Sequence, residues 1–313
     1  MIHVACKRRR EELQPDSDKR LKTHVPLLSL AVKNAHSFDS RIVFLEDDHT
    51  YWLDEKYKFP ISVSGVWASF FDKFDPVAIV NTYFYRWAAE PSSKYHQIIL
   101  DGRASGKGDQ VIMDEIMAMW AMTGELASKR GSYVHRQIEL ALNDIEHDDT
   151  YLEMTQFRDF RVGVVEQRGW LPYRTEWSIY DADRMIAGQI DCIFVDAQGA
   201  FHMVDWKCCR KPLDPEEGIV WQRHGSAPCH FLLDNKFNHY AAQQNLYAVI
   251  LLDIYGIALA SMSLVQFTAE HDSYRMLSVP RFYPAARSML DICSARCLSE
   301  SSSGTVDTSL AGA

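Results

Sequence analysis

Residues 188–207 read GQIDCIFVDAQGAFHMVDWK. Asp191 stands in one mainly apolar segment of this stretch, and Asp205 and Lys207 stand in a second. The β-branched and aromatic residues predict two strands, and the polar stretch 196–199 predicts a turn between them. Asp205 and Lys207 are two residues apart, so a strand directs both side chains to one face. The turn would fold the second strand back and bring Asp191 close to Asp205. The stretch therefore predicts an antiparallel pair that carries a carboxylate–lysine cluster.

Such a cluster suits the cleavage of phosphodiester bonds. The reaction needs charge neutralised on the phosphate, a nucleophilic water and a stabilised leaving oxygen, and divalent ions held by carboxylates supply all three. Burying two acids in apolar strands is costly unless a metal ion or Lys207 compensates their charge. The alternative interpretation is two ordinary half-exposed acids and a lysine on a sheet face. The Gly-Gln-Ile-Asp sequence that ends at Asp191, inside an apolar strand, favours the catalytic interpretation.

Further elements surround this pair. Downstream and just upstream, the patterns predict strands at 173–180 and 259–268 and helices at 237–255 and 285–298. Nearer the N-terminus, they predict a hairpin at 41–53, a helical stretch to about residue 90, and two helices within 108–146 broken near Thr123 and Gly124. The order helix, three-stranded meander, long irregular segment, helix, strand predicts an α/β fold with a central mixed sheet flanked by helices.

The chain of 313 residues is predicted to have four regions. They are a flexible basic arm at 1–25, an N-terminal extension (a small hairpin plus helices) at 26–123, an α/β core at 124–299, and a disordered tail at 300–313. Hydrophobic residues make up 47% of the chain, which is enough to bury a sizeable core.

The decisive stretch resembles the signature of PD-(D/E)XK nucleases, in their RecB-like and viral or mitochondrial exonuclease branch. Residues 131–139 (GSYVHRQIE) resemble a helix motif of that branch in which a histidine, here His135, supplies a metal ligand. Glu176 matches an acidic position in the first strand, and residues 243–247 (QQNLY) resemble a Gln-x-x-x-Tyr motif. The first acid follows Gly-Gln-Ile instead of proline, which is common in the branch. The resemblance covers about residues 124–268 and implies a restriction-endonuclease-like core.

The resemblance also implies roles for individual residues. The catalytic residues it implies are Asp191, Asp205, Lys207, Glu176, Gln243 and Tyr247. The ligands it implies for one or two Mg²⁺ or Mn²⁺ ions are His135, Asp191, Asp205 and the backbone carbonyl of Trp206. Lys207 would orient and help to deprotonate the attacking water, or stabilise charge on the phosphate. Metal ions would lower its pKa and Asp205 would raise it, so the direction is left open.

The irregular segment 208–235 follows Lys207 directly, so its first residues are expected near the cut. Cations beside an aromatic ring suit a single strand, because phosphates follow the charge and a base stacks on the ring. An ordinary polar surface loop is the alternative. The expected nucleic-acid contacts are Lys129, Arg130, Arg210, Lys211, Trp221 and Arg223.

Net charge and targeting signals bound the partners. The net charge of −9 counts against a bulk nucleic-acid coat protein but not against an enzyme with a local basic groove. DNA ends or single strands are the expected substrates, while RNA, polarity and pathway stay open. No apolar run approaches the ~20 residues that span a bilayer, so a soluble intracellular protein without membrane contact is expected. Basic clusters at 7–10 and 19–22 suit a nuclear-import signal or a charged tail.

Seven cysteines, an odd number, predict reduced thiols, since Cys208 and Cys209 are adjacent in a long chain. Some RecB-like nucleases hold an iron–sulfur cluster. The spacing of Cys229, Cys293 and Cys297 departs from theirs, so no cluster is expected.

Three other functions compete with that of a nuclease. A catalytically inactive nuclease fold would bind nucleic acid without cutting it, but every expected acid and the lysine are present. An interaction module could use the aromatic-rich first hundred residues, for which packing on the core is the simpler interpretation. A metal hydrolase of another class lacks support, because the histidines show no His-Glu-x-x-His spacing.

Overall fold

The computed structural model describes residues 28–219 and 223–303. The predictions for the basic clusters at 7–10 and 19–22, for Trp221 and for residues 304–313 lie outside this range. Among the helices of the described ranges, none combines the length and the apolar character that spanning a bilayer requires.

The predicted three-stranded meander is confirmed. It consists of β5 (Leu171–Asp181), β6 (Ile186–Val195) and β7 (Phe201–Cys208), each antiparallel to the next. The carboxylate of Asp196 accepts hydrogen bonds from the backbone N–H groups of Gln198 and Ala200, at 2.9 and 2.8 Å. This Asx turn at Asp196 reverses the chain and sets the register in which Cys192 of β6 pairs with Val204 of β7.

Three more strands complete a six-stranded mixed sheet. They are β8 (Leu259–Phe267), parallel to β7; β9 (Arg275–Ser278), antiparallel to β8; and β4 (Ile61–Ser62), parallel to β6. β8 matches the prediction. The sequence did not predict β4 and β9, because two and four residues are too few to show a period.

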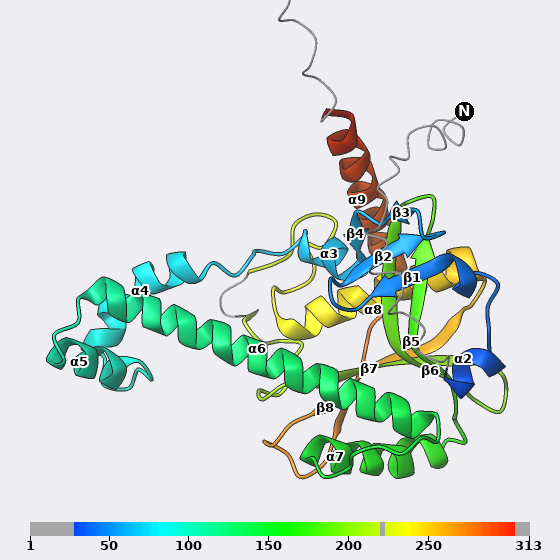
Figure 1. The fold of residues 1–313 in the computed structure, drawn as a ribbon, viewed down its shortest axis with the longest axis horizontal. Helices are drawn as coiled ribbons and strands as arrows, with labels where there is room; N and C mark the ends of the chain where they lie inside the picture. Colours follow the sequence, from blue (N-terminus) through cyan, green and yellow to red (C-terminus); the bar gives the residue numbers. More distant parts are fainter. Residues whose placement is uncertain (1–27, 220–222, 304–313) are drawn as a thin grey trace, which may run out of the picture. The chain divides into compact units, whose positions relative to one another are not determined.

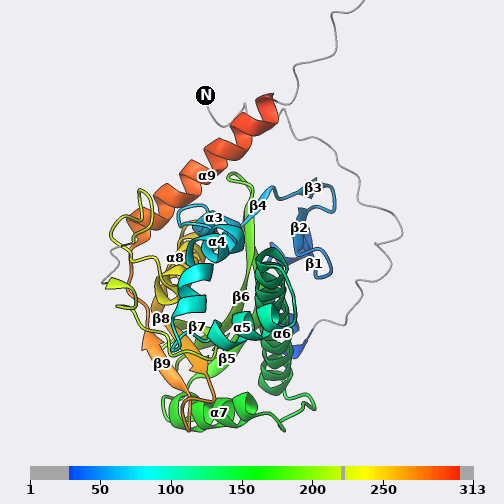
Figure 2. The same cartoon turned by 90° about the vertical axis from the view of Figure 1, so that its left-hand side faces the viewer.

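Helices cover both faces of this sheet, as predicted for an α/β fold (Figure 1, Figure 2). On one face, α3 (Val63–Ala68), α8 (Lys236–Tyr255) and α9 (Tyr283–Ser303) share a core with the strands. On the other face, α7 (Leu152–Phe160) continues as a π-helix, Arg161–Glu166. Its Phe157 and Phe160 rings meet the Trp206 ring edge-on, at 5.7 and 5.4 Å between centroids.

Helix α8 has clear signals at both ends. The side chain of Asn235 accepts a hydrogen bond from the N–H of Asn238, and Gly256 ends the helix in the left-handed conformation, with φ +69°. Between them the helix is buried on most sides, with Ala241, Ala242 and Leu246 fully enclosed. It therefore fixes firmly the side chains that face the sheet.

The predicted hairpin at 41–53 is confirmed and gains a third strand. It comprises β1 (Ile42–Leu45), β2 (Thr50–Leu53) and β3 (Tyr57–Lys58). Leu53 and Phe59 are buried against Tyr180 and Ala187 of the central sheet. The hairpin thus shares a core with β5 and β6.

Residues Lys73–Val134 form a second compact unit, while the described residues up to Asp72 and from His135 onward form the first. The second unit contains α4 (Pro76–Ala89), α5 (His96–Ala104) and most of α6 (Asp109–Leu142). Its core is built from apolar side chains of all three helices, including Phe84, Ile99 and Ile112.

The predicted break near Thr123 and Gly124 is wrong, because α6 is one helix of 34 residues. The Thr123 hydroxyl donates to the carbonyl of Met119 one turn earlier, at 2.7 Å, which satisfies it without breaking the helix. The predicted boundary between residues 123 and 124 therefore falls inside a continuous helix. The helical stretch predicted to about residue 90 is found as α4, which follows the short helix α3 after a gap.

Candidate metal centre

Three side chains from three elements converge beside the sheet. His135 comes from α6, Glu176 from β5 and Asp191 from β6. His135 Nδ1 lies 3.5 Å from Asp191 Oδ2 and 3.7 Å from Glu176 Oε1. The ligand atoms of all three lie within 4.8 Å of one another, the one such group of histidine, cysteine or acidic side chains found across residues 28–219 and 223–303.

The two carboxylates face each other because of the strand register. Glu176 and Asp191 occupy opposite positions between the pairs Thr175↔Cys192 and Trp177↔Ile190. Glu176 has φ +43°, in the left-handed region that residues other than glycine seldom adopt. Backbone strain of this kind gathers at functional sites. Here it accompanies the one acid of β5 that reaches the group.

The backbone of Trp206 orients two members of the group. His135 Nε2 donates to the carbonyl oxygen of Trp206 at 2.9 Å, which leaves Nδ1 directed at the carboxylates. The N–H of Trp206 donates to Asp191 Oδ2 at 2.8 Å. The family resemblance implied that this carbonyl binds metal, but here it accepts a hydrogen bond from the imidazole. Its role as a metal ligand stays a prediction.

Asp205 and Lys207 form a buried ion pair next to this group. Lys207 Nζ lies 2.6 Å from Asp205 Oδ2 and 4.5 Å from the centroid of the Tyr240 ring. Asp205 Oδ2 is buried and has no hydrogen-bond partner of good geometry. Its negative charge is therefore balanced by the neighbouring Lys207 ammonium. Asp205 is not one of the three clustered ligand residues. Its expected role as a ligand stays a prediction.

Charges within the group oppose the effect of burial on His135. Burial lowers the pKa of this imidazole, but the carboxylates of Asp191 and Glu176 outweigh it and raise the pKa to about 9. With no ion present, His135 is therefore protonated at neutral pH. The imidazolium then supplies the positive charge that a metal ion would otherwise supply.

The other charged groups respond in the same way. Burial raises the pKa of Asp191, although His135 and Lys207 act to lower it. Burial and the charge of Asp191 raise the pKa of Asp205 to about 6, against the effect of Lys207. Burial lowers the pKa of Lys207, but Asp205 and Asp191 raise it further, so the net direction is upward. Lys207 is therefore an ammonium at neutral pH.

Gln243 and Tyr247 lie one turn apart on α8, and Gln243 Nε2 donates to the Tyr247 hydroxyl at 3.2 Å. Tyr247 is buried, and the pKa of its phenol is raised by that burial. Its ring approaches β6 so closely that a Cβ on Gly188 would stand 2.7 Å from Tyr247 Cε1. The glycine three residues before Asp191 thus allows the ring to approach.

The structure adds residues that the motifs did not reveal. Burial, and then the charges of Glu176 and Asp191, raise the pKa of Tyr51, so its phenol lies within their electrostatic reach. Tyr240 covers Lys207 from α8, three residues before Gln243. That helical spacing is a signal the sequence contained. Tyr51 had none, because it comes from the hairpin far upstream.

Acids lie beside several of the expected nucleic-acid contacts. Lys129 pairs with Glu125 at 2.6 Å on the helical unit, with Arg130 next to it. Arg223 pairs with Asp72 and Asp234, at 3.0 and 3.3 Å. Arg210, 92% exposed at its side chain, lies 3.7 Å from Glu270, and Lys211 is exposed beside it. Acids therefore neutralise part of this charge, and contact with nucleic acid stays a prediction for all five described residues.

The donor set fits a divalent cation. Two ligands each about 2.1 Å from one ion stand roughly 3 to 4 Å apart, which is the range found for His135 with both carboxylates. One imidazole and two carboxylates suit Mn²⁺, and the oxygen donors suit Mg²⁺. The buried Asp205 Oδ2, without a directional hydrogen bond, lies in the same electrostatic cluster.

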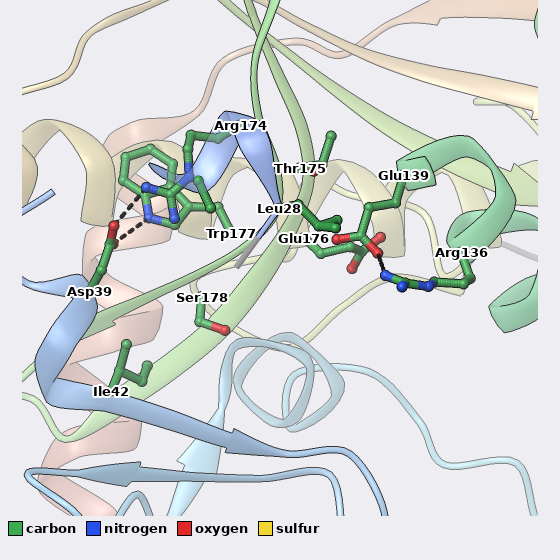
Figure 3. A pocket seen from close by; sticks show the side chains of 11 residues that line it. Leu28, Asp39, Ile42, Arg136, Glu139, Arg174, Thr175, Glu176, Trp177 and Ser178 are labelled. Atoms are coloured by element: carbon green, nitrogen blue, oxygen red, sulfur yellow. Dashed lines mark hydrogen bonds and ion pairs between the residues drawn. The ribbon is translucent and has the colours of Figure 1, made fainter. Parts of the chain in front are cut away.

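A cavity of about 260 Å³ adjoins Glu176 on the side of the hairpin (Figure 3). Its charged lining residues are paired: Arg136 with Glu139, and Arg174 with Asp39. These two pairs balance each other, so Glu176 is the one lining acid outside them, and it faces His135 of the candidate metal centre.

No family model and no curated protein matches the sequence. Several solved structures are similar to part of it, among them the following two. The protein SSO0001 is 15% identical, with a TM-score of 0.25, and the match covers 54% of this chain and 71% of that one. An alkaline exonuclease from Laribacter hongkongensis is 13% identical, with a TM-score of 0.28, covering 54% and 79%. Scores this low carry no argument, so the functional assignment depends on the site itself.

Proposed function

We propose that this protein is a metal-dependent nuclease that hydrolyses phosphodiester bonds, a DNA exonuclease of the RecB-like PD-(D/E)XK type acting on ends or single strands. One observation carries the proposal. His135 Nδ1 lies 3.5 Å and 3.7 Å from the Asp191 and Glu176 carboxylates, beside the buried Asp205–Lys207 pair.

Mg²⁺ or Mn²⁺ would be held by His135 Nδ1, Glu176 and Asp191, with Asp205 as a further ligand. The carbonyl of Trp206 accepts from the opposite ring nitrogen of His135, so it would serve only a second ion. When bound, such an ion neutralises phosphate charge and lowers the pKa of a coordinated water. The hydrogen bond from His135 Nε2 to Trp206 keeps the ligating nitrogen in place. The N–H of Trp206 does the same for Asp191.

The raised pKa of Lys207 narrows its role. As an ammonium at neutral pH, it is a hydrogen-bond donor, suited to orient the attacking water or to stabilise a phosphate oxygen. Asp205, with a pKa of about 6, is better suited than Lys207 to accept a proton from that water. Gln243 and Tyr247 would contact the water or a phosphate from α8.

The substrate follows from the same chemistry. Arg210 and Lys211 come directly after β7, so a strand bound at the centre would pass near them. Lys129, Arg130 and Arg223 would contact other phosphates of the substrate. The nuclear location suggested by the basic clusters at 7–10 and 19–22 stays part of the proposal.

The experiment is cleavage of end-labelled linear, circular and single-stranded DNA and of RNA, with Mn²⁺ and with EDTA. Wild type and Asp191→Asn are compared, because this variant keeps the shape of the side chain and removes its charge. We expect metal-dependent loss of the labelled nucleotide from linear DNA, abolished in the variant. Binding of DNA without cleavage by the wild type would instead support the inactive nuclease fold.

A further inference from the structure

A carboxylate outside the metal centre bridges two residues that lie on either side of Glu176. Asp39 belongs to a 3-10 turn, Asp39–Arg41, before the hairpin. Its Oδ2 accepts from Arg174 Nη1 at 2.7 Å, and its Oδ1 accepts from Trp177 Nε1 at 2.9 Å. Figure 3 shows Asp39 facing both side chains. One acid thus ties together positions 174 and 177 of β5.

This bridge is largely withdrawn from water. The side chain of Arg174 is 6% exposed and that of Asp39 is 26% exposed. The guanidinium stands 4.6 Å from the Trp177 ring centroid and also donates to the carbonyl of Asn34, at 2.9 Å. Charge-assisted hydrogen bonds in such surroundings are stronger than exposed ion pairs. Arg174 Nε is buried with no partner, so losing Asp39 would leave more of the guanidinium unpaired.

The backbone between the two anchored positions is strained. Glu176 has φ +43°, and such a conformation persists only where the surroundings hold it. Gln189 Nε2 holds the carbonyl of Glu176 at 3.1 Å from the side of β6. Asp39 holds the side chains before and after it. Together these contacts fix the one residue of β5 that reaches His135.

We propose that Asp39 is a positioning residue for the metal centre: by bridging Arg174 and Trp177 it holds the β5 backbone that presents Glu176 to a divalent ion. The inference rests on the proposed function, because it takes the group of His135, Glu176 and Asp191 to be a metal site. The proposal gives residues 34–41, which precede the hairpin, a role in metal binding. A bridge that merely fastens this segment to the sheet would affect stability and leave metal affinity unchanged.

Metal affinity is the readout that separates these two roles. Mn²⁺ is titrated into the 313-residue chain while free Mn²⁺ is followed by electron paramagnetic resonance, and unfolding by urea is measured in parallel. Loss of a residue that orients a metal ligand typically weakens affinity about 10- to 100-fold, so Asp39→Asn should weaken Mn²⁺ binding at least about tenfold. The Mn²⁺ affinity and the free energy of unfolding of Asp39→Asn are then compared with those of a control variant.

Asp54→Asn is the matched control. Asp54 makes a bidentate ion pair with Arg41, two residues after Asp39, at 2.8 and 2.7 Å. The β5 residue that this pair influences is Tyr180, four positions beyond Glu176. Asparagine also tolerates the positive φ of +52° at this position. The control should keep wild-type Mn²⁺ affinity.

Trp177→Phe keeps the proposal falsifiable if Asp39→Asn does not fold. It removes the indole donor to Asp39 and should weaken Mn²⁺ binding about fivefold, the equivalent of one hydrogen bond. Wild-type affinity in a folded Asp39→Asn, or in Trp177→Phe when the first does not fold, would overturn the positioning role alone. A wild-type chain that binds no Mn²⁺ would instead overturn the proposed function.

Discussion

At the scale of single residues, His135 shows how a proton and a metal ion compete for one nitrogen. Its Nδ1 faces two carboxylates, and these raise its pKa to about 9 in spite of burial. An ion that binds there must displace this proton. The same electrostatics that make the site attractive to a cation therefore make its affinity depend on pH.

The direction of this dependence follows from the sign of the shift. The pKa of His135 is about 9, so its imidazole is protonated at lower pH and must lose a proton when Mn²⁺ binds. Apparent Mn²⁺ affinity should therefore rise about tenfold per pH unit between about pH 6.5 and 8.5. Calorimetric titration in two buffers of different ionisation enthalpy measures this, and should count about one proton released per ion. Affinity that is constant over this range, with no proton released, would contradict the account.

Without metal, the same shift has a consequence for stability. The folded-state pKa of His135, about 9, exceeds the ordinary value of 6.5, so its contribution is complete below about pH 6.5 and is lost as pH rises towards 9. The free energy of unfolding of the EDTA-treated protein should fall over that window. In His135→Gln, which has nothing to titrate there, the fall should be smaller. Equal slopes in both proteins would count against the imidazolium.

A substitution of Lys207 tests whether its ammonium takes part in catalysis. Replacing it by methionine removes the ammonium 2.6 Å from Asp205 and should lower kcat at least about 100-fold, with the secondary structure retained. Lys58→Met, an exposed lysine of β3, is the matched control and should leave kcat unchanged. Cleavage at the wild-type rate by a folded Lys207→Met would remove this residue from the mechanism.

At the scale of elements, the sequence predicts well where the pattern is long and local. The meander and α8 follow from alternating or helical periods and from clear end signals, so Asp191, Asp205 and Lys207 could be placed together from residues alone. The meeting of α6 with β5 and β6 is a tertiary contact, and the motif resemblance alone pointed to it. Asp39 and Tyr51 could not be found, because nothing local indicates which strand they will touch.

The continuity of α6 and the close approach at β6 can be tested with one pair of glycine variants. A Cβ on Gly188 would meet Tyr247 at 2.7 Å and Val63 at 3.0 Å, so Gly188→Ala should cost about 1–3 kcal/mol. Gly124 has open space and lies within the helix, so Gly124→Ala should stabilise by up to about 1 kcal/mol. Urea unfolding measures both. Destabilisation by Gly124→Ala would argue for the broken helix that the sequence predicted.

At the scale of the whole molecule, residues far apart in sequence pack together in the unit that holds the central sheet. The hairpin of residues 42–58 packs on β5 and β6, and β4 adds a strand to their sheet. The sequence patterns placed these residues in a separate extension, because local patterns give no information on packing partners. The helical unit Lys73–Val134 has its own core.

Leucine truncations test whether the hairpin is part of the central core. Leu53 is fully buried, so Leu53→Ala should lower the free energy of unfolding by about 2–5 kcal/mol. Leu171 of β5 is 64% exposed, and the same change there should cost less than about 0.5 kcal/mol. If both variants lose equally little stability, the hairpin does not contribute to the core.

The central claim is that His135, Glu176 and Asp191 hold one divalent cation. A crystal of the wild-type protein soaked in Mn²⁺ tests it directly, because the anomalous signal locates the ion independently of any activity. We expect a peak about 2.1 Å from His135 Nδ1 and from an oxygen of each carboxylate. An empty map at these three side chains in a Mn²⁺-soaked crystal, or a peak only elsewhere, would contradict the account.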